Sequence, residues 1–293
     1  WHGAVGLESF EPVNQYLTDS VPGVIDLPLT KRTRYIKTDN FSLFPASEAA
    51  YIGIRQPLGW INVGFLDDLE AHITLIDGQL PRVASGDDEI VQVLVSQGLA
   101  EQTGLQPGEL YTAFKQARMV TAADGKSLTE LRAVQLQLEI SGVWAATDET
   151  DPFWFYSPKA LEATMFMPEE SFRNRIAPAM DDEVYAAIWY LVFDGESIRT
   201  DDVPALVGRI NYANAQISSL LANTTLDLSP LDALQKYRWT TFVMTIVLYV
   251  FSAPILLLVL YFIGLISGLV VARQRGEIAI FKSRGAGDIQ VIG

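Results

Sequence analysis

Residues 239–272 read WTTFVMTIVLYVFSAPILLLVLYFIGLISGLVVA, a run of 34 residues without a charged side chain. A bilayer core of ~30 Å needs about 20 apolar residues in a helix, and a helix of this run would be roughly 50 Å long. The sequence therefore predicts a transmembrane helix with a stalk over 237–272. The excess length indicates tilt or continuation beyond the bilayer, and Pro254 is expected to kink the helix.

The residues that flank this run predict its orientation. Lys236 and Arg238 precede it, and four basic residues follow it: Arg273, Arg275, Lys282 and Arg284. Because basic residues favour the cytoplasmic side of a membrane, residues 273–293 are predicted to be cytoplasmic. Residues 1–236 would then be extracytoplasmic, in a protein of the cell membrane (inner or plasma membrane).

Two further features of the run suggest how it sits among lipids and other helices. Tyr237 and Trp239 stand at its outer end, where aromatic residues commonly anchor a helix in the membrane interface. Gly264 and Gly268 form a small-xxx-small pair, which indicates a face for packing against another helix.

The remainder of the chain is strongly acidic. The 293 residues carry a net charge of −14, and residues 1–238 hold 17 basic against 33 acidic side chains. Nucleic-acid binding requires a cationic surface, so no nucleic-acid partner is expected. The absence of cysteine excludes disulfides and thiolate metal sites within this chain.

The chain begins at Trp1 and ends at Gly293, directly after a segment that reads as the start of another element. We expect that it is a piece of a longer protein.

Residues 1–236 show the pattern of an α+β domain, or of two small α+β lobes. Residues 1–20 suggest an amphipathic helix, with Pro22-Gly23 as its break. In 89–115, a buried strand leads into a short helix opened by Ser96 and closed by Gly104. Further strands are predicted at 34–37, 51–55, 60–65, 131–143 and 186–193.

Two helices complete the predicted domain. The apolar residues of 202–221 recur at helical spacing, so this segment is predicted to be a helix. Ser229-Pro230 is a favourable start for the last helix, which is expected to run without a break into the membrane span.

A search for catalytic or metal-binding residues finds no specific pattern. His72 lies near Asp67, Asp68 and Glu70, but one histidine among carboxylates is more typical of a solvated acidic segment than of a metal site. A second acidic group, formed by Asp148, Glu149 and Asp151, lacks the spacing of a calcium loop. No metal and no cofactor is expected.

Two other motifs also favour structural interpretations. Residues 124–127 (DGKS) lack the first glycine of a phosphate-binding loop and are interpreted as a turn. The aromatic stretch 152–156 (PFWFY) is predicted to pack in the core. The alternative is that this stretch and Trp60 contact an amphipathic ligand.

The segment after the span, ARQRGEIAIFKSRGAGDIQVIG over 272–293, could form an interfacial anchor helix. It also closely resembles the segment after the second membrane helix in permeases of the FtsX/MacB-like ABC transporter family. That pattern is a basic stretch, a Glu-Ile pair, an apolar pair and Arg-x-x-Gly-Ala. The matching residues are Arg273, Arg275, Glu277, Ile278, Ile280, Phe281, Arg284, Gly285 and Ala286.

The resemblance has one departure and one further support. Ser283 to Ala286 stand where the family usually has an Ala-Leu-Gly-Ala type sequence. VLVSQGLAEQTGLQPGEL over 93–110 is similar to the strand–helix–turn of the family's extracytoplasmic domain. Strong motif matches cover about 89–115 and 270–293, whereas the layout of elements is similar over nearly the whole chain.

This resemblance implies a non-enzymatic permease subunit with a MacB-like periplasmic core domain. It would pair with a second permease subunit, identical or not, and with a cytoplasmic ABC ATPase that hydrolyses ATP. The tail would be the coupling helix, with docking residues Arg275, Glu277, Ile278, Ile280, Phe281, Arg284 and Gly285. One membrane helix would precede Trp1 and at least two would follow Gly293.

The resemblance leaves open what the complex acts on: export, lipoprotein release and mechanotransmission to cell-wall hydrolases are all found in such families. A membrane-bound sensor with an extracytoplasmic ligand-binding domain is the alternative, and it would need an output domain after Gly293. A membrane-anchored enzyme is disfavoured because no catalytic constellation stands out.

Overall fold

The computed structural model describes residues 1–46, 56–86, 90–123, 126–180 and 183–283. The chain divides into two units, Trp1–Leu228 and Ser229–Gly293. The first is a mixed α/β sheet domain and the second is a long apolar helix. The domain boundary predicted at 236 stays a prediction.

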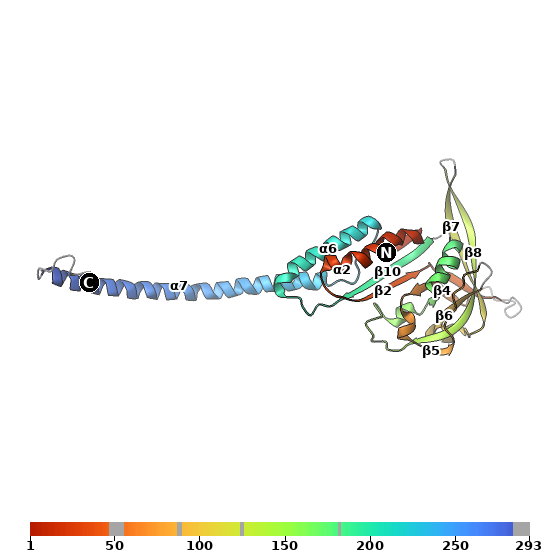
Figure 1. The fold of residues 1–293 in the computed structure, drawn as a ribbon, viewed down its shortest axis with the longest axis horizontal. Helices are drawn as coiled ribbons and strands as arrows, with labels where there is room; N and C mark the ends of the chain where they lie inside the picture. Colours follow the sequence, from red (N-terminus) through yellow and green to blue (C-terminus); the bar gives the residue numbers. More distant parts are fainter. Residues whose placement is uncertain (47–55, 87–89, 124–125, 181–182, 284–293) are drawn as a thin grey trace. The chain divides into compact units, whose positions relative to one another are not determined.

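One mixed sheet runs through the first unit (Figure 1). Its strands are β1 His2–Gly6, β2 Leu29–Lys37, β3 Phe41–Pro45, β4 Gly59–Leu66, β5 Ile73–Gly78, β6 Val91–Ser96, β7 Leu110–Ala123, β8 Lys126–Ala146, β9 Thr164–Phe166 and β10 Glu183–Phe193. The order of neighbours is β1-β10-β2-β4-β3-β7-β8-β6-β9, and β5 pairs with β8.

Part of this sheet closes on itself. The short strand β9 pairs in parallel with β4, through Val63 and Met165, and it also pairs with β6, through Leu94 and Phe166. Strands β4, β3, β7, β8, β6 and β9 therefore form a closed ring in which each strand pairs with a neighbour on either side. Closure removes free strand edges, and the ring supplies fully buried side chains, including Leu43, Ile61, Val63, Val93, Val95, Ala113, Leu138, Ile140 and Met165.

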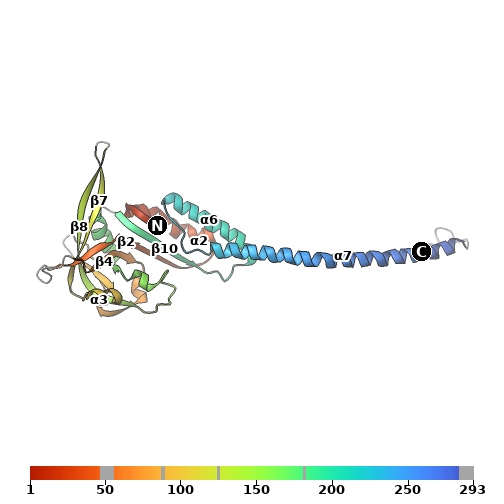
Figure 2. The same ribbon diagram turned by 180° about the vertical axis from the view of Figure 1, so that it is seen from behind.

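Helices cover the other part of the sheet. Helices α1 Glu11–Asp19, α2 Val21–Ile25 and α6 Val203–Leu220 contact one another, and α2 and α6 lie beside β10 in both views (Figures 1 and 2). Phe10 and Trp189 pack edge to face at 5.7 Å, and the Trp189 indole N–H donates to Asn14 Oδ1 at 2.6 Å. These contacts fix α1 against β10.

The remaining elements are short except for the last. They are η1 Leu7–Phe10, η3 Leu69–His72, α3 Gln97–Thr103, η4 Pro158–Leu161, α4 Glu169–Ser171, the π-helical turn η5 Phe172–Ile176, α5 Ala177–Ala179, η6 Thr200–Asp202 and α7 Leu231–Ser283.

Most of the predicted strands and helices are present. Strands at 34–37, 60–65, 131–143 and 186–193 and the helix at 202–221 are confirmed within β2, β4, β8, β10 and α6. The Ser96 hydroxyl accepts a bond from Leu99 N at 3.1 Å, and Gly104 ends α3 with φ +79°. The strand predicted at 51–55 lies outside the described residues, as do two residues of the turn predicted at 124–127.

The prediction for the first 25 residues is wrong at its start. His2–Gly6 is a strand rather than helix, because it pairs with β10 more than 170 residues further along the chain. The break predicted near Pro22-Gly23 is present: α1 ends at Asp19, and Pro22 and Gly23 lie in the first turn of a second helix, α2. Proline is tolerated there because the first N–H groups of a helix have no partner in any case.

Candidate functional site

Helix α7 is a single unbroken helix of 53 residues. Ser229 Oγ accepts a bond from Leu231 N at 3.2 Å at its start, and Leu234 N donates to Pro230 O at 2.8 Å. The prediction of a helix that begins at Ser229-Pro230 and continues without a break into the apolar run is therefore confirmed. At 1.5 Å per residue it is about 80 Å long.

The stretch Leu231–Arg273 of this helix is long and apolar enough to cross a membrane. Its most apolar 18 residues have a mean hydropathy of 2.8, and none of them is buried in the structure. Trp239, Tyr249 and Phe251 are each about two-thirds exposed or more, at 67%, 70% and 71%. So large a continuous apolar surface requires lipid or other helices to cover it.

The threonine hydroxyls within the apolar helix form hydrogen bonds with the backbone of the same helix. Thr240 Oγ1 donates to Lys236 O at 2.9 Å, and Thr245 Oγ1 donates to Thr241 O at 2.8 Å. Pro254 lies inside the helix, where it removes one backbone N–H donor. Helices in lipid tolerate both hydroxyl groups that bond to their own backbone and a proline within the helix.

Gly264 and Gly268 lie in the C-terminal half of α7, toward Arg273. A Cβ atom built on either glycine would meet no heavy atom within 4 Å. Both positions therefore offer a close approach to another helix, and their packing role stays a prediction.

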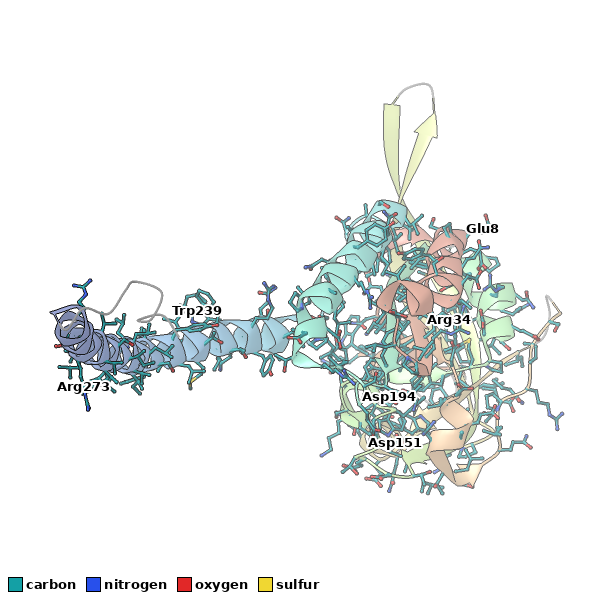
Figure 3. All side chains as sticks on the ribbon, turned by 60° about the vertical axis from the view of Figure 1, so that its left-hand side comes forward. Glu8, Arg34, Asp151, Asp194, Trp239 and Arg273 are labelled. Atoms are coloured by element: carbon teal, nitrogen blue, oxygen red, sulfur yellow. The ribbon has the colours of Figure 1, made fainter. Side chains whose placement is uncertain are left out.

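The predicted docking residues fall at the end of the same helix. Arg275, Glu277, Ile278, Ile280 and Phe281 lie in the last turns of α7, which ends at Ser283, and Arg275 is exposed. Arg284 and Gly285 lie outside the described residues. Trp239 begins the charge-free run and Arg273 directly follows it (Figure 3).

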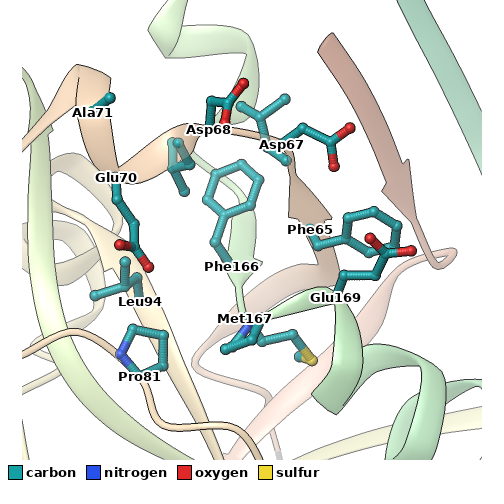
Figure 4. A pocket seen from close by; sticks show the side chains of 13 residues that line it. Phe65, Asp67, Asp68, Glu70, Ala71, Pro81, Leu94, Phe166, Met167 and Glu169 are labelled. Carbon is teal, nitrogen blue, oxygen red and sulfur yellow. The ribbon is translucent and has the colours of Figure 1, made fainter. Parts of the chain in front are cut away.

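A second candidate site is a pocket of about 450 Å³ in the first unit (Figure 4). Phe166 lies in the centre of this view, with Leu94 and Met167 nearby. These three side chains are at most 5% exposed. The pocket lies where β4 ends, beside η3, β9 and α4, and its lining residues are Phe65, Leu66, Asp67, Asp68, Leu69, Glu70, Ala71, Pro81, Leu94, Phe166, Met167, Pro168 and Glu169.

The pocket contains four carboxylates and no basic side chain. Arg34, which is not a lining residue, lies 3.3 Å from Asp67, contacts Glu169 and stacks over Phe65 with 5.0 Å between its guanidinium carbon and the ring centre. Arg173 lies 2.9 Å from Glu169. Burial raises the pKa of Asp67. The charge of Arg34 and its hydrogen bond partly offset this increase.

Sequence reasoning found part of this pocket. It singled out Asp67, Asp68 and Glu70 as an acidic segment but did not connect them with Glu169, about 100 residues later. The β4–β9 pairing brings these residues together. The sequence did contain one indication that Glu169 belongs to this acidic group: the Pro-Glu-Glu sequence at 168–170 directly follows the apolar residues 164–167 (TMFM).

His72 packs against neighbouring side chains of the sheet domain. Its Nδ1 lies 2.6 Å from Asp151 Oδ2, and its ring stacks on Phe153 at 3.9 Å, with Lys31 Nζ 4.5 Å from the Phe153 ring centre. The two acidic segments noted in the sequence are thus joined through His72. Among the described residues, no group of three or more histidine and carboxylate side chains is arranged to hold a metal.

The aromatic stretch 152–156 packs mainly in the core, as predicted. Phe153, Trp154 and Phe155 are at most 7% exposed, whereas Tyr156 is 49% exposed and pairs with Asp227. Trp60 is 63% exposed. Its proposed contact with an amphipathic ligand stays a prediction.

Comparison with known proteins adds little to this geometry. No protein-family profile and no curated protein matches the chain. One similar solved structure is a domain of a Porphyromonas gingivalis protein provisionally described as a permease, at 12% identity and a TM-score of 0.30, covering 66% of this chain and 68% of that one. Similarity at this level does not establish a shared fold.

Proposed function

We propose that this chain is part of a permease subunit of an ABC transporter complex, which couples ATP hydrolysis on a separate ATPase to movement of an extracytoplasmic domain. The observation that carries the proposal is α7, one continuous helix that leads from residue 231, just beyond the sheet domain, through the uncharged run to the Glu277–Phe281 segment. A continuous helix is suited to transmit a displacement along its axis.

The length of α7 supports its division into three parts. About 20 residues suffice to cross the bilayer core, so turns remain at both ends. Asp232, Lys236 and Arg238 make the first turns polar, as expected for a stalk in water, and Arg273 and Arg275 mark the exit from the membrane. The large acidic unit is then extracytoplasmic.

The tail supplies the expected contact with the ATPase. In this proposal Glu277, Ile278, Ile280 and Phe281 form the docking face, Arg275 and Arg284 make polar contacts with the ATPase or with lipid headgroups, and Gly285 ends the segment. A second permease subunit would cover Gly264 and Gly268. ATP binding and hydrolysis occur on the partner, and the chain needs no cofactor.

The test is stimulation of the partner ATPase in reconstituted complexes. Glu277→Lys and Ile280→Asp are each expected to abolish stimulation while the protein still inserts into membranes. Glu101→Lys, the same charge reversal at an exposed position of α3, is the control and should leave stimulation unchanged. Normal stimulation in both tail variants would contradict the docking assignment.

The coding sequence beyond Gly293 separates the permease from a receptor. Further membrane spans, beside a gene with a phosphate-binding loop, would support the permease. A kinase or cyclase domain in that place would favour the sensor and overturn the proposal.

A further inference from the structure

Strands β7 and β8 continue past the strands that flank them. β3 pairs with β7 through Tyr111–Phe114, and β6 and β5 pair with β8 from Leu138 onward, but β7 and β8 stay paired with each other as far as their common turn. Residues 116–123 and 126–133 therefore form a two-stranded ribbon, visible beyond the other strands (Figures 1 and 2). Among the described residues, no third strand pairs with this ribbon.

The ribbon lacks the support that a stable sheet needs. A two-stranded hairpin is at best marginally stable in water, and a third strand or a covering helix is needed to stabilise it. The unpaired N–H and C=O groups along its edges can pair with another chain. Each edge is about 27 Å long, and neither strand of the ribbon contains a proline that would prevent such pairing.

The part of β8 in the ribbon has a self-complementary charge pattern. Lys126, Leu128 and Glu130 share one face, because side chains alternate along a strand. If two copies of β8 run antiparallel and are centred on Leu128, Lys126 of each copy lies opposite Glu130 of the other. Centring on Thr129 would instead bring Lys126 against Arg132, and a parallel pair would align like charges. Opposite charges across a sheet stabilise it, whereas like charges destabilise it.

The backbone of β8 fits the register centred on Leu128. Ile140 N donates to Glu109 O at 3.0 Å, and the β7–β8 pairing continues from there to the turn without a bulge. Since bonded and non-bonded pairs alternate along an antiparallel ladder, the N–H and C=O groups of Ser127 and Thr129 lie on the free edge. In this register, Ser127 of one copy would bond to Thr129 of the other.

We propose that two copies of this chain associate through the ribbon, with β8 of one copy antiparallel to β8 of the other and Leu128 at the two-fold axis. The two ribbons then form one four-stranded sheet. A two-fold contact of this kind is closed and uses the same surface on both copies, as in most homodimers. This proposal goes beyond the permease function, because it requires only a second copy and no ATPase.

The test is disulfide formation in isolated membranes from cells that produce the whole chain, which has no cysteine of its own. The two Leu128 residues would form a non-hydrogen-bonded pair with Cα atoms ~4.5 Å apart, within the range of about 4.4–6.8 Å that disulfides span. Leu128→Cys should therefore form a dimer on mild oxidation with copper phenanthroline. Ser127→Cys produced together with Thr129→Cys should also cross-link. Glu196→Cys, on an exposed loop, measures random collision.

Charge substitutions in the Leu128→Cys chain test the register. Lys126→Glu would place two pairs of like charges opposite each other and should slow cross-linking by about tenfold. The double variant Lys126→Glu/Glu130→Lys exchanges the two charges, restores both opposite pairs and should cross-link at the original rate. Glu101→Lys, at an exposed position of α3, is the control and should have no effect.

Three results would overturn the proposal. The first is no dimer above the Glu196→Cys level from either Leu128→Cys or the Ser127→Cys and Thr129→Cys mixture. The second is an unchanged rate in Lys126→Glu, and the third is a double variant as slow as Lys126→Glu alone. Because no ATPase is present, none of these results bears on the permease proposal, and failure of the tail variants in the ATPase assay would leave the ribbon contact unaffected.

Discussion

At the scale of single residues, Asp39 and Lys115 link the start of β3 to β7. Lys115 Nζ lies 2.6 Å from Asp39 Oδ2, and Asn40 N donates to Asp39 Oδ1 at 2.7 Å. Burial alone would raise the pKa of Asp39, but these hydrogen bonds and the Lys115 charge outweigh burial and hold that pKa below its usual value. The carboxylate is therefore bound more favourably in the folded than in the unfolded chain.

This shift predicts a pH-dependent stability. Because the folded pKa of Asp39 lies below the unfolded value of about 3.9, its contribution is present above that value and is lost as the pH falls through the folded pKa. Asp39→Asn should be less stable than the wild type at pH 7, and the difference should disappear as the pH falls below about 4. Thermal unfolding followed by near-UV circular dichroism across pH 3–7 measures this.

The comparison in that experiment is Glu149→Gln, which removes an exposed carboxylate and should follow the wild-type curve. A constant difference between Asp39→Asn and wild type at all pH values would mean that the carboxylate charge contributes nothing.

Single residues also show which structural features can be predicted from the local sequence. Ser96 and Gly104 determine the ends of α3 through their own side chain and backbone, so both were predicted correctly. Pro22 carries a local signal too, but it fits the start of a helix as well as a break. The partner of His72 is Asp151, and no local rule predicts a contact across 79 residues.

At the scale of elements, β4 joins the two parts of the sheet. It pairs with β2 and β3 and, in parallel, with β9. Its composition predicted a strand, but its pairing with β9 joins residues about 100 positions apart, such as Asn62 and Thr164. The closed ring and the pocket beside it were therefore beyond prediction, whereas α7 was predicted because its absence of charge is a property of the segment itself.

Crowding around Gly64 in β4 makes this element sensitive to substitution. A Cβ atom there would lie 2.4 Å from the Ile36 carbonyl oxygen, which belongs to the backbone of β2 and cannot move aside. Gly64→Ala should lower the free energy of unfolding by about 1–3 kcal/mol, as overpacking does in protein cores. Denaturant unfolding of the nanodisc-inserted chain, followed by tryptophan fluorescence, measures the loss.

Gly59, in the same strand, is the matched control. A Cβ atom at Gly59 would meet the Thr103 methyl group at 3.4 Å, an ordinary contact. Gly59→Ala should change the free energy of unfolding by no more than about 0.5 kcal/mol. If both variants lose the same free energy of unfolding, the cause is the lower backbone flexibility of alanine in β4 and not crowding between Gly64 and β2.

At the scale of the whole molecule, charge divides the chain. Residues 1–228 hold 15 basic against 32 acidic side chains, whereas basic residues are in excess in 229–293, with 6 against 3. Acidic surface suits a solvated domain, and basic residues next to an apolar helix favour the cytoplasmic side. The acidic residues 1–228 and the basic residues that follow the apolar run are therefore expected on opposite sides of one membrane.

Because the chain contains no cysteine, single cysteines report this orientation without interference. Glu196→Cys, in the acidic unit, should react with a membrane-impermeant maleimide in intact cells stripped of any outer barrier. Gln274→Cys, after the apolar run, should react only once the membrane is permeabilised, because lipid separates it from the reagent. Labelling of both variants after permeabilisation controls for their reactivity.

Labelling of Gln274→Cys alone in intact cells would show the opposite orientation, with the acidic domain in the cytoplasm. Labelling of both in intact cells would show that α7 does not cross the bilayer, and the permease proposal would fail with it.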